Sequence, residues 1–247
     1  MHTDSISLNK FISDTGYCSR READNLIAQG RVLLNDKPAK LGNRYTLGDA
    51  IEVDGRLITT ESELKKKEDL IYIAFNKPVG ITTTTEEKIK GNIISFINHK
   101  KRIFPIGRLD KDSEGLIFLT NDGNIVNKIL RAGNNHEKEY IVRVDKPITD
   151  YFVKGMASGV RIKDGLTNPC YVKKISSNTF KIILTQGMNR QIRKMCDKFG
   201  YTVTSLQRIR IMNIKLDVGI GKWRYLTTTE MDEIMEMVKD SSKTHQP

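Results

Sequence analysis

The stretch GRLDKDSEGLIFLTNDG, residues 107–123, places an acidic side chain beside a strongly apolar segment. Asp110 follows an arginine and a leucine on a corner marked by Gly107, and the apolar run 116–119 comes shortly after it. Acidic side chains usually lie in solvent. An aspartate this close to a buried segment is therefore a candidate for the mouth of a cleft, where a carboxylate can take part in chemistry.

Calcium binding is one chemistry that the acidic residues near Asp110 could serve. A calcium loop follows the pattern D-x-[DN]-x-[DN]-G-x5-E, and Asp110, Asp112 and Gly115 fit it. Glu114, however, takes a position that prefers Asp or Asn, and Asn121 stands where a bidentate glutamate is needed. A neutral amide there removes the strongest ligand, so we expect no metal site.

Cofactor-free catalysis is the second chemistry open to Asp110. The chain has no GxxxxGK[ST] and no GxGxxG after a strand, so we expect neither phosphoryl transfer nor a nucleotide cofactor. A lone carboxylate could act as a nucleophile or a general base, and it would need a nearby cation to stay ionised when desolvated. The basic cluster 190–194 offers such cations. The residues alone leave open that Asp110 merely caps a turn.

The positive charge of the chain is concentrated in one region. The net charge is +11 over 247 residues, but residues 1–60 hold eight basic and eight acidic residues and carry none of it. Residues 181–215 hold eight basic residues and one acidic residue, a net of +7. A concentration of this kind favours a nucleic-acid surface over a merely solvated one.

Composition also bounds the class of protein. No segment approaches the roughly 20 apolar residues of a membrane helix, and the N-terminus lacks the apolar stretch of a signal peptide. The three cysteines form no CxxC, so neither a structural zinc nor a disulfide framework is indicated. We expect a reduced, cytoplasmic protein without membrane contact, and nothing in the sequence requires more than a monomer.

Two composition changes suggest the domain organisation. The charged stretch TTESELKKKEDL, residues 59–70, reads as a linker, and residues 239–247 form a polar tail. We expect a small module over 1–60, a linker over 61–69 and a larger module over 70–247.

The first module is predicted to pair two short helices with short strands. Leu8 and Phe11 have helical spacing, and Ser19 to Glu22 fits a capping box that opens a second helix closed near Gly30. Asp54-Gly55 marks a hairpin between later strands. The run 7–39 with the later G-D-x-I-x-V strand resembles the S4 RNA-binding domain. The resemblance implies RNA as the partner, with phosphate contacts from Arg20, Arg21, Arg31 and Lys37.

The second module is predicted to be α+β. Strands are expected within 70–84, 138–145, 180–187, 213–217 and 222–227. Helices are expected within 92–100, 122–133, 148–156, 190–200 and 228–239. Because strands and helices do not alternate regularly, we favour a largely antiparallel mixed sheet flanked by helices over a doubly wound parallel sheet.

A family resemblance gives Asp110 a role. PIGRLDKDSEGLIFLTNDG resembles the signature of pseudouridine synthases of the RsuA/RluB/RluE/RluF group, and the resemblance continues through HEKEYIV (136–142) and GMNRQIRKM (187–195). These enzymes break the glycosidic bond of a uridine, rotate the base and rejoin it through carbon 5, without a cofactor. Segments 130–150 and 206–216 look closest to a member that acts on large-subunit ribosomal RNA.

The resemblance implies a set of site residues. Asp110 would be catalytic, either by attacking the sugar at carbon 1′ or by taking a sugar proton. Tyr140 would stack on the detached uracil, and Arg193 would pair with Asp110 and keep it charged. The target base must be flipped out of its stack, and Arg108 would fill the gap. Around them, Ile192 would form an apolar wall, and Arg190 and Lys194 would meet phosphates.

Two other classes of function compete with this interpretation. A non-catalytic RNA-binding or ribosome-assembly factor would share the S4-like module and the charge, but it has no need of the G-R-L-D stretch with Tyr140 and the QIR segment. A metal-independent nucleoside hydrolase would usually need a second carboxylate, and the sequence singles none out. The main hypothesis is an isomerase acting on structured RNA, which is 23S ribosomal RNA or its assembly intermediate, with transfer RNA as a further candidate substrate.

Overall fold

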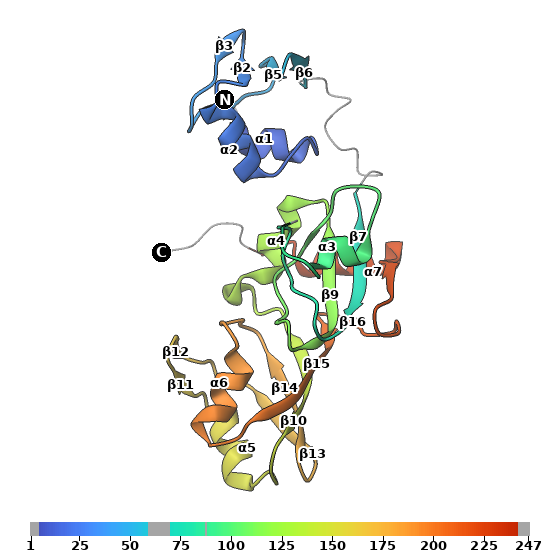
Figure 1. Ribbon diagram of the computed structural model, residues 1–247. Helices are drawn as coiled ribbons and strands as arrows, with labels where there is room; N and C mark the ends of the chain where they lie inside the picture. The colour runs from blue at the N-terminus through green and yellow to red at the C-terminus, as the bar shows by residue number, and fades with distance from the viewer. Residues whose placement is uncertain (1–4, 59–69, 87, 242–247) are drawn as a thin grey trace. The chain divides into compact units, whose positions relative to one another are not determined.

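The computed structural model describes residues 5–58, 70–86 and 88–241 (Figure 1). Contacts between Cα atoms divide the chain into two compact units, Met1–Leu70 and Ile71–Pro247. The predicted linker, residues 61–69, lies outside the described residues. No helix within the described ranges is long and apolar enough to cross a membrane.

The first unit packs two short helices against small antiparallel sheets. One sheet has the strand order β3-β2-β5-β6, and β1 pairs with β4 in the other. The elements are β1 (Ile6–Ser7), α1 (Leu8–Asp14), α2 (Arg20–Ala28), β2 (Val32–Leu34), β3 (Lys37–Pro38), β4 (Arg44–Tyr45), β5 (Ile51–Val53) and β6 (Arg56–Leu57).

Local sequence signals determine how these elements begin and end. The capping box predicted for α2 is confirmed, since the Glu22 N–H donates to Ser19 Oγ at 3.1 Å and the Ser19 N–H donates to the Glu22 carboxylate at 2.6 Å. The hairpin at Asp54-Gly55 is confirmed by positive φ at both residues, as a type I′ turn requires. Phe11 of α1 is buried and its ring stacks on Tyr45 with 3.7 Å between centroids.

The second unit is built on one nine-stranded mixed sheet. Its strand order is β13-β14-β10-β15-β9-β7-β17, with β16 beside β15 and β8 beside β9. All these pairs are antiparallel except β15 with β9, so the predicted α+β fold with a largely antiparallel sheet is confirmed. The strands are β7 (Tyr72–Lys77), β8 (Phe104–Pro105), β9 (Glu114–Thr120), β10 (Lys138–Val144), β13 (Tyr171–Ser176), β14 (Thr179–Leu184), β15 (Val203–Ile211), β16 (Ile214–Lys215) and β17 (Trp223–Tyr225).

Helices flank this sheet at the positions that the sequence predicts. A separate two-stranded ribbon, β11 with β12, lies between α5 and β13 in the chain. The remaining elements are α3 (Ile93–Ile97), α4 (Gly123–Leu130), the 3-10 turn η2 (Ala132–Asn134), α5 (Asp150–Ala157), β11 (Arg161–Ile162), β12 (Gly165–Leu166), α6 (Gln191–Lys198) and α7 (Thr228–Met237).

The two central strands β7 and β9 are buried on both faces. Phe118 and Ala74 pack into one hydrophobic cluster, whereas Ile117 and Phe75 pack into another on the opposite face. A strand covered on both sides reads as a continuous apolar run without alternation. The sequence predicts no strand over 114–120 because a short apolar run fits a buried helix as well as a buried strand.

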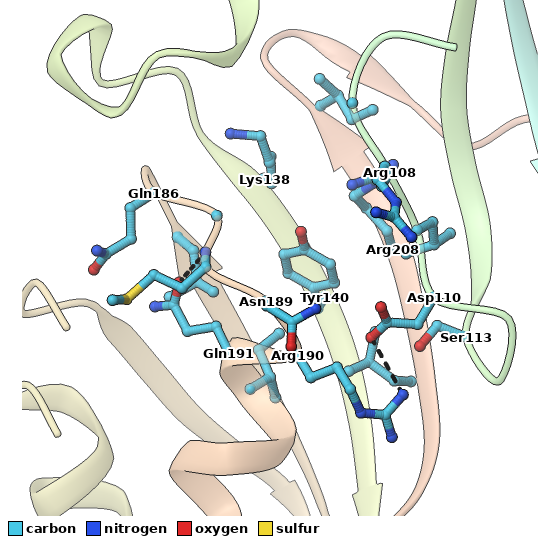
Figure 2. A pocket seen from close by; sticks show the side chains of 18 of the residues that line it. Arg108, Asp110, Ser113, Lys138, Tyr140, Gln186, Asn189, Arg190, Gln191 and Arg208 are labelled. Carbon is cyan, nitrogen blue, oxygen red and sulfur yellow. Dashed lines mark hydrogen bonds and ion pairs between the residues drawn. The ribbon is translucent and has the colours of Figure 1, made fainter. Parts of the chain in front are cut away.

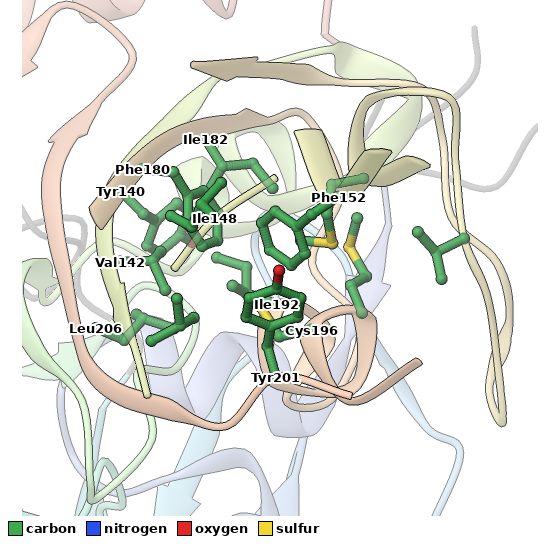
Figure 3. Close-up of a cluster of buried hydrophobic side chains, with 14 of the residues drawn as sticks. Tyr140, Val142, Ile148, Phe152, Phe180, Ile182, Ile192, Cys196, Tyr201 and Leu206 are labelled. Atoms are coloured by element: carbon green, nitrogen blue, oxygen red, sulfur yellow. The ribbon is translucent and has the colours of Figure 1, made fainter. Parts of the chain in front are cut away.

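A third cluster attaches α5 and α6 to the other half of the sheet (Figure 3). Phe152 of α5 packs against Phe180 of β14 and Tyr201, while Ile192 and Cys196 of α6 contribute from the next helix. Fully buried contacts of this kind each contribute about 1.5–3 kcal/mol. The cluster therefore holds the start of α6 at a defined place beside β10 and β15.

Candidate active site

A pocket of about 400 Å³ opens where the central strands meet the loop before β9 and the start of α6 (Figure 2). Its wall combines apolar side chains with one carboxylate and several cations, and its volume suits a small organic group. The polar and charged side chains that line it are Arg108, Asp110, Ser113, Lys138, Tyr140, Gln186, Asn189, Arg190, Gln191, Arg193 and Arg208.

The loop that carries Asp110 is fixed by local bonds. The buried Thr83 hydroxyl donates to the Leu109 carbonyl at 2.6 Å, and the Ser113 N–H donates to the Asp110 carbonyl at 3.0 Å. Gly107 has φ of +78°, and a Cβ there would lie 2.7 Å from a methyl of Leu130. The prediction that Asp110 lies at the mouth of a cleft is consistent with this geometry, since its side chain is one-third exposed and lines the pocket.

Arg190 is the cation that pairs with Asp110. Its Nη1 lies 3.8 Å from Oδ2 of Asp110, and its two Nη atoms donate to both carboxylate oxygens of Asp112 at 3.0 and 2.9 Å. The hydrogen bond from Arg190 is the main cause of the lowered pKa of Asp112. Arg190 is the N-cap of α6 and has φ of +50° in the left-handed region, which an arginine adopts at a cost of about 1 kcal/mol.

The predicted ion pair between Arg193 and Asp110 is therefore corrected. Arg193 donates through Nη2 to the Asp112 carbonyl at 2.8 Å and to Ser113 Oγ at 3.1 Å, and Nη1 donates to the Val203 carbonyl. Its Nε lies 3.4 Å from an Asp112 carboxylate oxygen. Arg193 thus ties α6 to the loop that carries Asp110 and to β15.

Tyr140 presents its ring to the pocket from the middle of the sheet. It lies on β10, is 8% exposed and also belongs to the hydrophobic cluster behind the pocket. Arg208 of β15 is its direct cross-strand partner, with the guanidinium carbon 6.0 Å from the ring centroid. The structure thus brings Tyr140 of β10 and Asp110 of the loop before β9 into one pocket.

The other predicted pocket residues divide into two groups. Arg108 is exposed at the pocket and Ile192 is a buried part of its wall. Lys194 donates to the Asp164 carboxylate and to Asn189 Oδ1, and it does not line the pocket. The sequence indicates no individual role for Lys138 and Arg208, the buried cations of the pocket. Both lie on strands that also carry more exposed charged residues, and nothing in the sequence separates them from these.

The four predicted RNA contacts of the first unit are all exposed. Arg20 and Arg21 lie in the first turn of α2, and Lys37 is on β3. Arg31 instead forms a two-point ion pair with Asp54 at 2.7 and 2.8 Å, to which Tyr17 also donates. Its guanidinium is therefore already engaged, and a phosphate would have to share or displace Asp54.

Comparison with known proteins identifies the class. The sequence model of the RNA pseudouridylate synthase family matches residues 71–198, and that of the S4 domain matches residues 7–51. A crystal structure described as a pseudouridylate synthase superposes with a TM-score of 0.67 at 25% identity, covering 93% of this chain and 99% of the other. The chain belongs to the RNA pseudouridylate synthase family and is an isomerase that acts on RNA.

Relatives that match over most of their length show which members of this family the chain resembles. The chain is 55% identical to the dual-specificity RNA pseudouridine synthase RluF of Salmonella typhi over 98% of its length and 83% of the relative's. It is 54% identical to that of Escherichia coli K12 over the same shares. The ribosomal large subunit pseudouridine synthase B of Bacillus subtilis is 31% identical over 92% and 94%. The predicted resemblance to RluF is confirmed.

Proposed function

We propose that the chain isomerises a uridine of 23S ribosomal RNA, with Asp110 as the catalytic carboxylate. Among the described residues that line the pocket, Asp110 is the single carboxylate, and Arg190 lies 3.8 Å from it. A hydrolase that cleaves a glycosidic bond with two carboxylates would need a second acid in this wall. One carboxylate facing an aromatic ring suits a reaction that breaks and remakes a glycosidic bond without adding water.

The family resemblance suggests a role for each pocket residue, and the positions of these residues support the assignment. Asp110 attacks carbon 1′ or takes a sugar proton, Tyr140 stacks on the detached base, and Arg190 stabilises the ionised carboxylate. Arg108, exposed at the rim, fills the space that the flipped nucleotide leaves in the RNA. Ile192 supplies an apolar wall, and Lys194 contacts a phosphate when RNA competes with Asp164.

The substrate assignment is supported by the relatives. RluF is named a dual-specificity RNA enzyme, and synthase B of Bacillus subtilis is named for the large ribosomal subunit. We take large-subunit ribosomal RNA, or its assembly intermediate, as the first substrate of this chain and a transfer RNA as the second. The enzyme acts as a cytoplasmic monomer, and Arg20, Arg21, Arg31 and Lys37 of the first unit bind RNA phosphates.

The test of this proposal is an Asp110→Asn variant assayed on 23S ribosomal RNA and on transfer RNA from cells that lack the enzyme. The amide keeps the shape but cannot act as nucleophile or base, so pseudouridine formation should fall at least about 10⁴-fold while RNA binding persists. Asp150→Asn, at an exposed carboxylate in the first turn of α5, is the matched control. Full turnover by Asp110→Asn would show that the carboxylate assignment is wrong.

A further inference from the structure

Breaking the glycosidic bond places negative charge on the base. Whether Asp110 attacks carbon 1′ or removes a sugar proton, the electron pair of the C1′–N1 bond leaves with N1. The detached uracil is then an anion whose charge is shared with its two carbonyl oxygens. Such an anion inside a pocket shielded from water needs fixed cations or hydrogen-bond donors aimed at it. The inference about which side chains supply them rests on the proposed function.

Arg208 is a cation that the protein holds in the pocket wall without a full set of partners. Its side chain is 4% exposed, and Nε donates to the Leu116 carbonyl at 2.6 Å. Its Nη2 is buried and has no hydrogen-bond partner among the described residues. A buried donor of a charged group is costly to leave unpaired, so its retention calls for a ligand.

The backbone around Arg208 is built to hold this position. Arg208 of β15 pairs with Gly115 of β9 on one side and with Tyr140 of β10 on the other. Gly115 has φ of +108°, and a Cβ there would lie 2.3 Å from the Arg208 carbonyl oxygen, so only glycine permits this approach. The guanidinium is thus placed by three strands beside the ring that is proposed to stack on the base.

Lys138 is a second buried cation in the same wall. It lies two residues before Tyr140 on β10, so both side chains leave the same face of the strand (Figure 2). It is 7% exposed, and Nζ donates to the His136 carbonyl at 3.3 Å. Burial and then the charge of Arg208 lower the pKa of Lys138 to about 8.

We propose that Arg208 and Lys138 bind the carbonyl oxygens of the uracil anion and stabilise it between bond cleavage and bond formation. When the C1′–N1 bond breaks, its electron pair moves to N1, and either a C1′–O bond to Asp110 forms or Asp110 gains the sugar proton. When carbon 5 bonds to carbon 1′, the Asp110 oxygen leaves or Asp110 returns its proton to the sugar. Carbon 5 then loses its proton and N1 gains one.

A leaving-group test separates this role from a structural one. Single-turnover rates are measured for Arg208→Gln and Lys138→Met on a stem-loop RNA that carries uridine or 5-fluorouridine at the target position. Fluorine withdraws electrons and stabilises the base anion without help from the protein. With uridine each variant should lose about 100-fold in rate, as for removal of one anion-stabilising donor. With 5-fluorouridine, followed as loss of the N1-linked nucleoside, the deficit should shrink to about 10-fold or less.

The controls keep the outcomes distinct. Arg210→Gln removes a guanidinium from the same strand that is bound to Glu137 and Glu139 outside the pocket, and it should keep the wild-type rate. Arg208→Lys, which keeps the charge, should recover part of the loss. Thermal unfolding and RNA affinity are measured for every variant, and Lys138→Met decides the matter if Arg208→Gln does not fold.

Equal deficits on both substrates, or no deficit in either variant, would overturn the proposal. Those results leave the proposed function intact if the wild-type protein forms pseudouridine and Asp110→Asn does not. A wild-type protein that forms none would instead overturn the proposed function.

Discussion

The candidate RNA-contacting cations of the first unit and the two buried pocket cations of the second unit differ in their exposure to solvent. In the first unit Arg20, Arg21 and Lys37 are exposed, where water solvates them and any polyanion can reach them. In the second unit Lys138 and Arg208 are buried in a pocket that contains a single carboxylate. Exposed cations cost little in the absence of a ligand, whereas buried ones do not. The exposed cations therefore suit the proposed binding of RNA, and the buried cations suit the proposed stabilisation of charge during the reaction.

The largest effect is expected at Gly115, because its close approach to the Arg208 backbone fixes the position of Arg208. We expect Gly115→Ala to lower the free energy of unfolding by about 3 kcal/mol or more, because the new methyl would overlap the Arg208 backbone at a positive φ. Urea denaturation measures the change. Gly133→Ala, where a Cβ meets nothing within 4 Å, should change stability by less than about 0.5 kcal/mol. Similar values for both would show that the close approach carries no strain.

The exposed side of the pocket is tested at Arg190. We expect Arg190→Gln to slow single-turnover isomerisation by about 10- to 100-fold, because the cation 3.8 Å from Asp110 is lost. RNA affinity should change less than the rate. Arg193→Gln should act mainly on stability, since Arg193 bonds to two backbone carbonyls and Ser113. A larger rate loss for Arg193→Gln than for Arg190→Gln would show that Arg193 is the cation that pairs with Asp110, as the sequence suggested.

The binding role of the first unit is tested at Arg20 and Arg21. We expect the double variant Arg20→Gln, Arg21→Gln to weaken RNA binding about 10-fold and to flatten the dependence of log affinity on log salt by about one unit per lost phosphate contact. The rate at saturating RNA should not change. Lys40→Gln, at another exposed cation of this unit, is the control. An unchanged dependence of log affinity on log salt would show that these arginines do not contact RNA phosphates.

The smallest effect is expected outside the pocket, at the ion pair of Arg224 with Glu230. Arg224 lowers the pKa of Glu230 to about 2 from its ordinary 4.5, so the pair stabilises the fold above about pH 4.5 and this contribution is lost as the pH falls toward 2. Glu230→Gln should therefore lower stability by about 1 kcal/mol at pH 7 and by almost nothing at pH 2. Denaturation at several pH values measures it, and a pH-independent difference would contradict this sign.

Much of this architecture is predictable from sequence because the signals are local. The capping box at Ser19 and the turn at Asp54-Gly55 depend on neighbouring residues alone. Strands β13 and β15 are not predicted because charged and polar residues interrupt them, and packing against β14 and β10 decides their conformation.

The site shows the same division between local and long-range information. Family motifs correctly indicate that Asp110 and Tyr140 line one pocket. The family resemblance indicates Arg193 as the partner of Asp110, and the sequence does not show that Arg190 precedes the helix in a left-handed conformation that brings it nearer. The sequence does not show that Lys138 and Arg208 lie in the pocket, because they become buried only when β10 and β15 pair.

The parallel contact between β15 and β9 has a consequence for the whole catalyst. A ladder of two residue pairs, Gln207 with Glu114 and Arg208 with Gly115, joins the two antiparallel halves of the sheet. The proposed catalytic carboxylate, Asp110, lies on the loop that enters β9 in one half, and Tyr140 lies on β10 in the other. The pocket is therefore assembled across a narrow seam, and the alignment of Asp110 with Tyr140 depends on how firmly the two halves of the sheet are joined there.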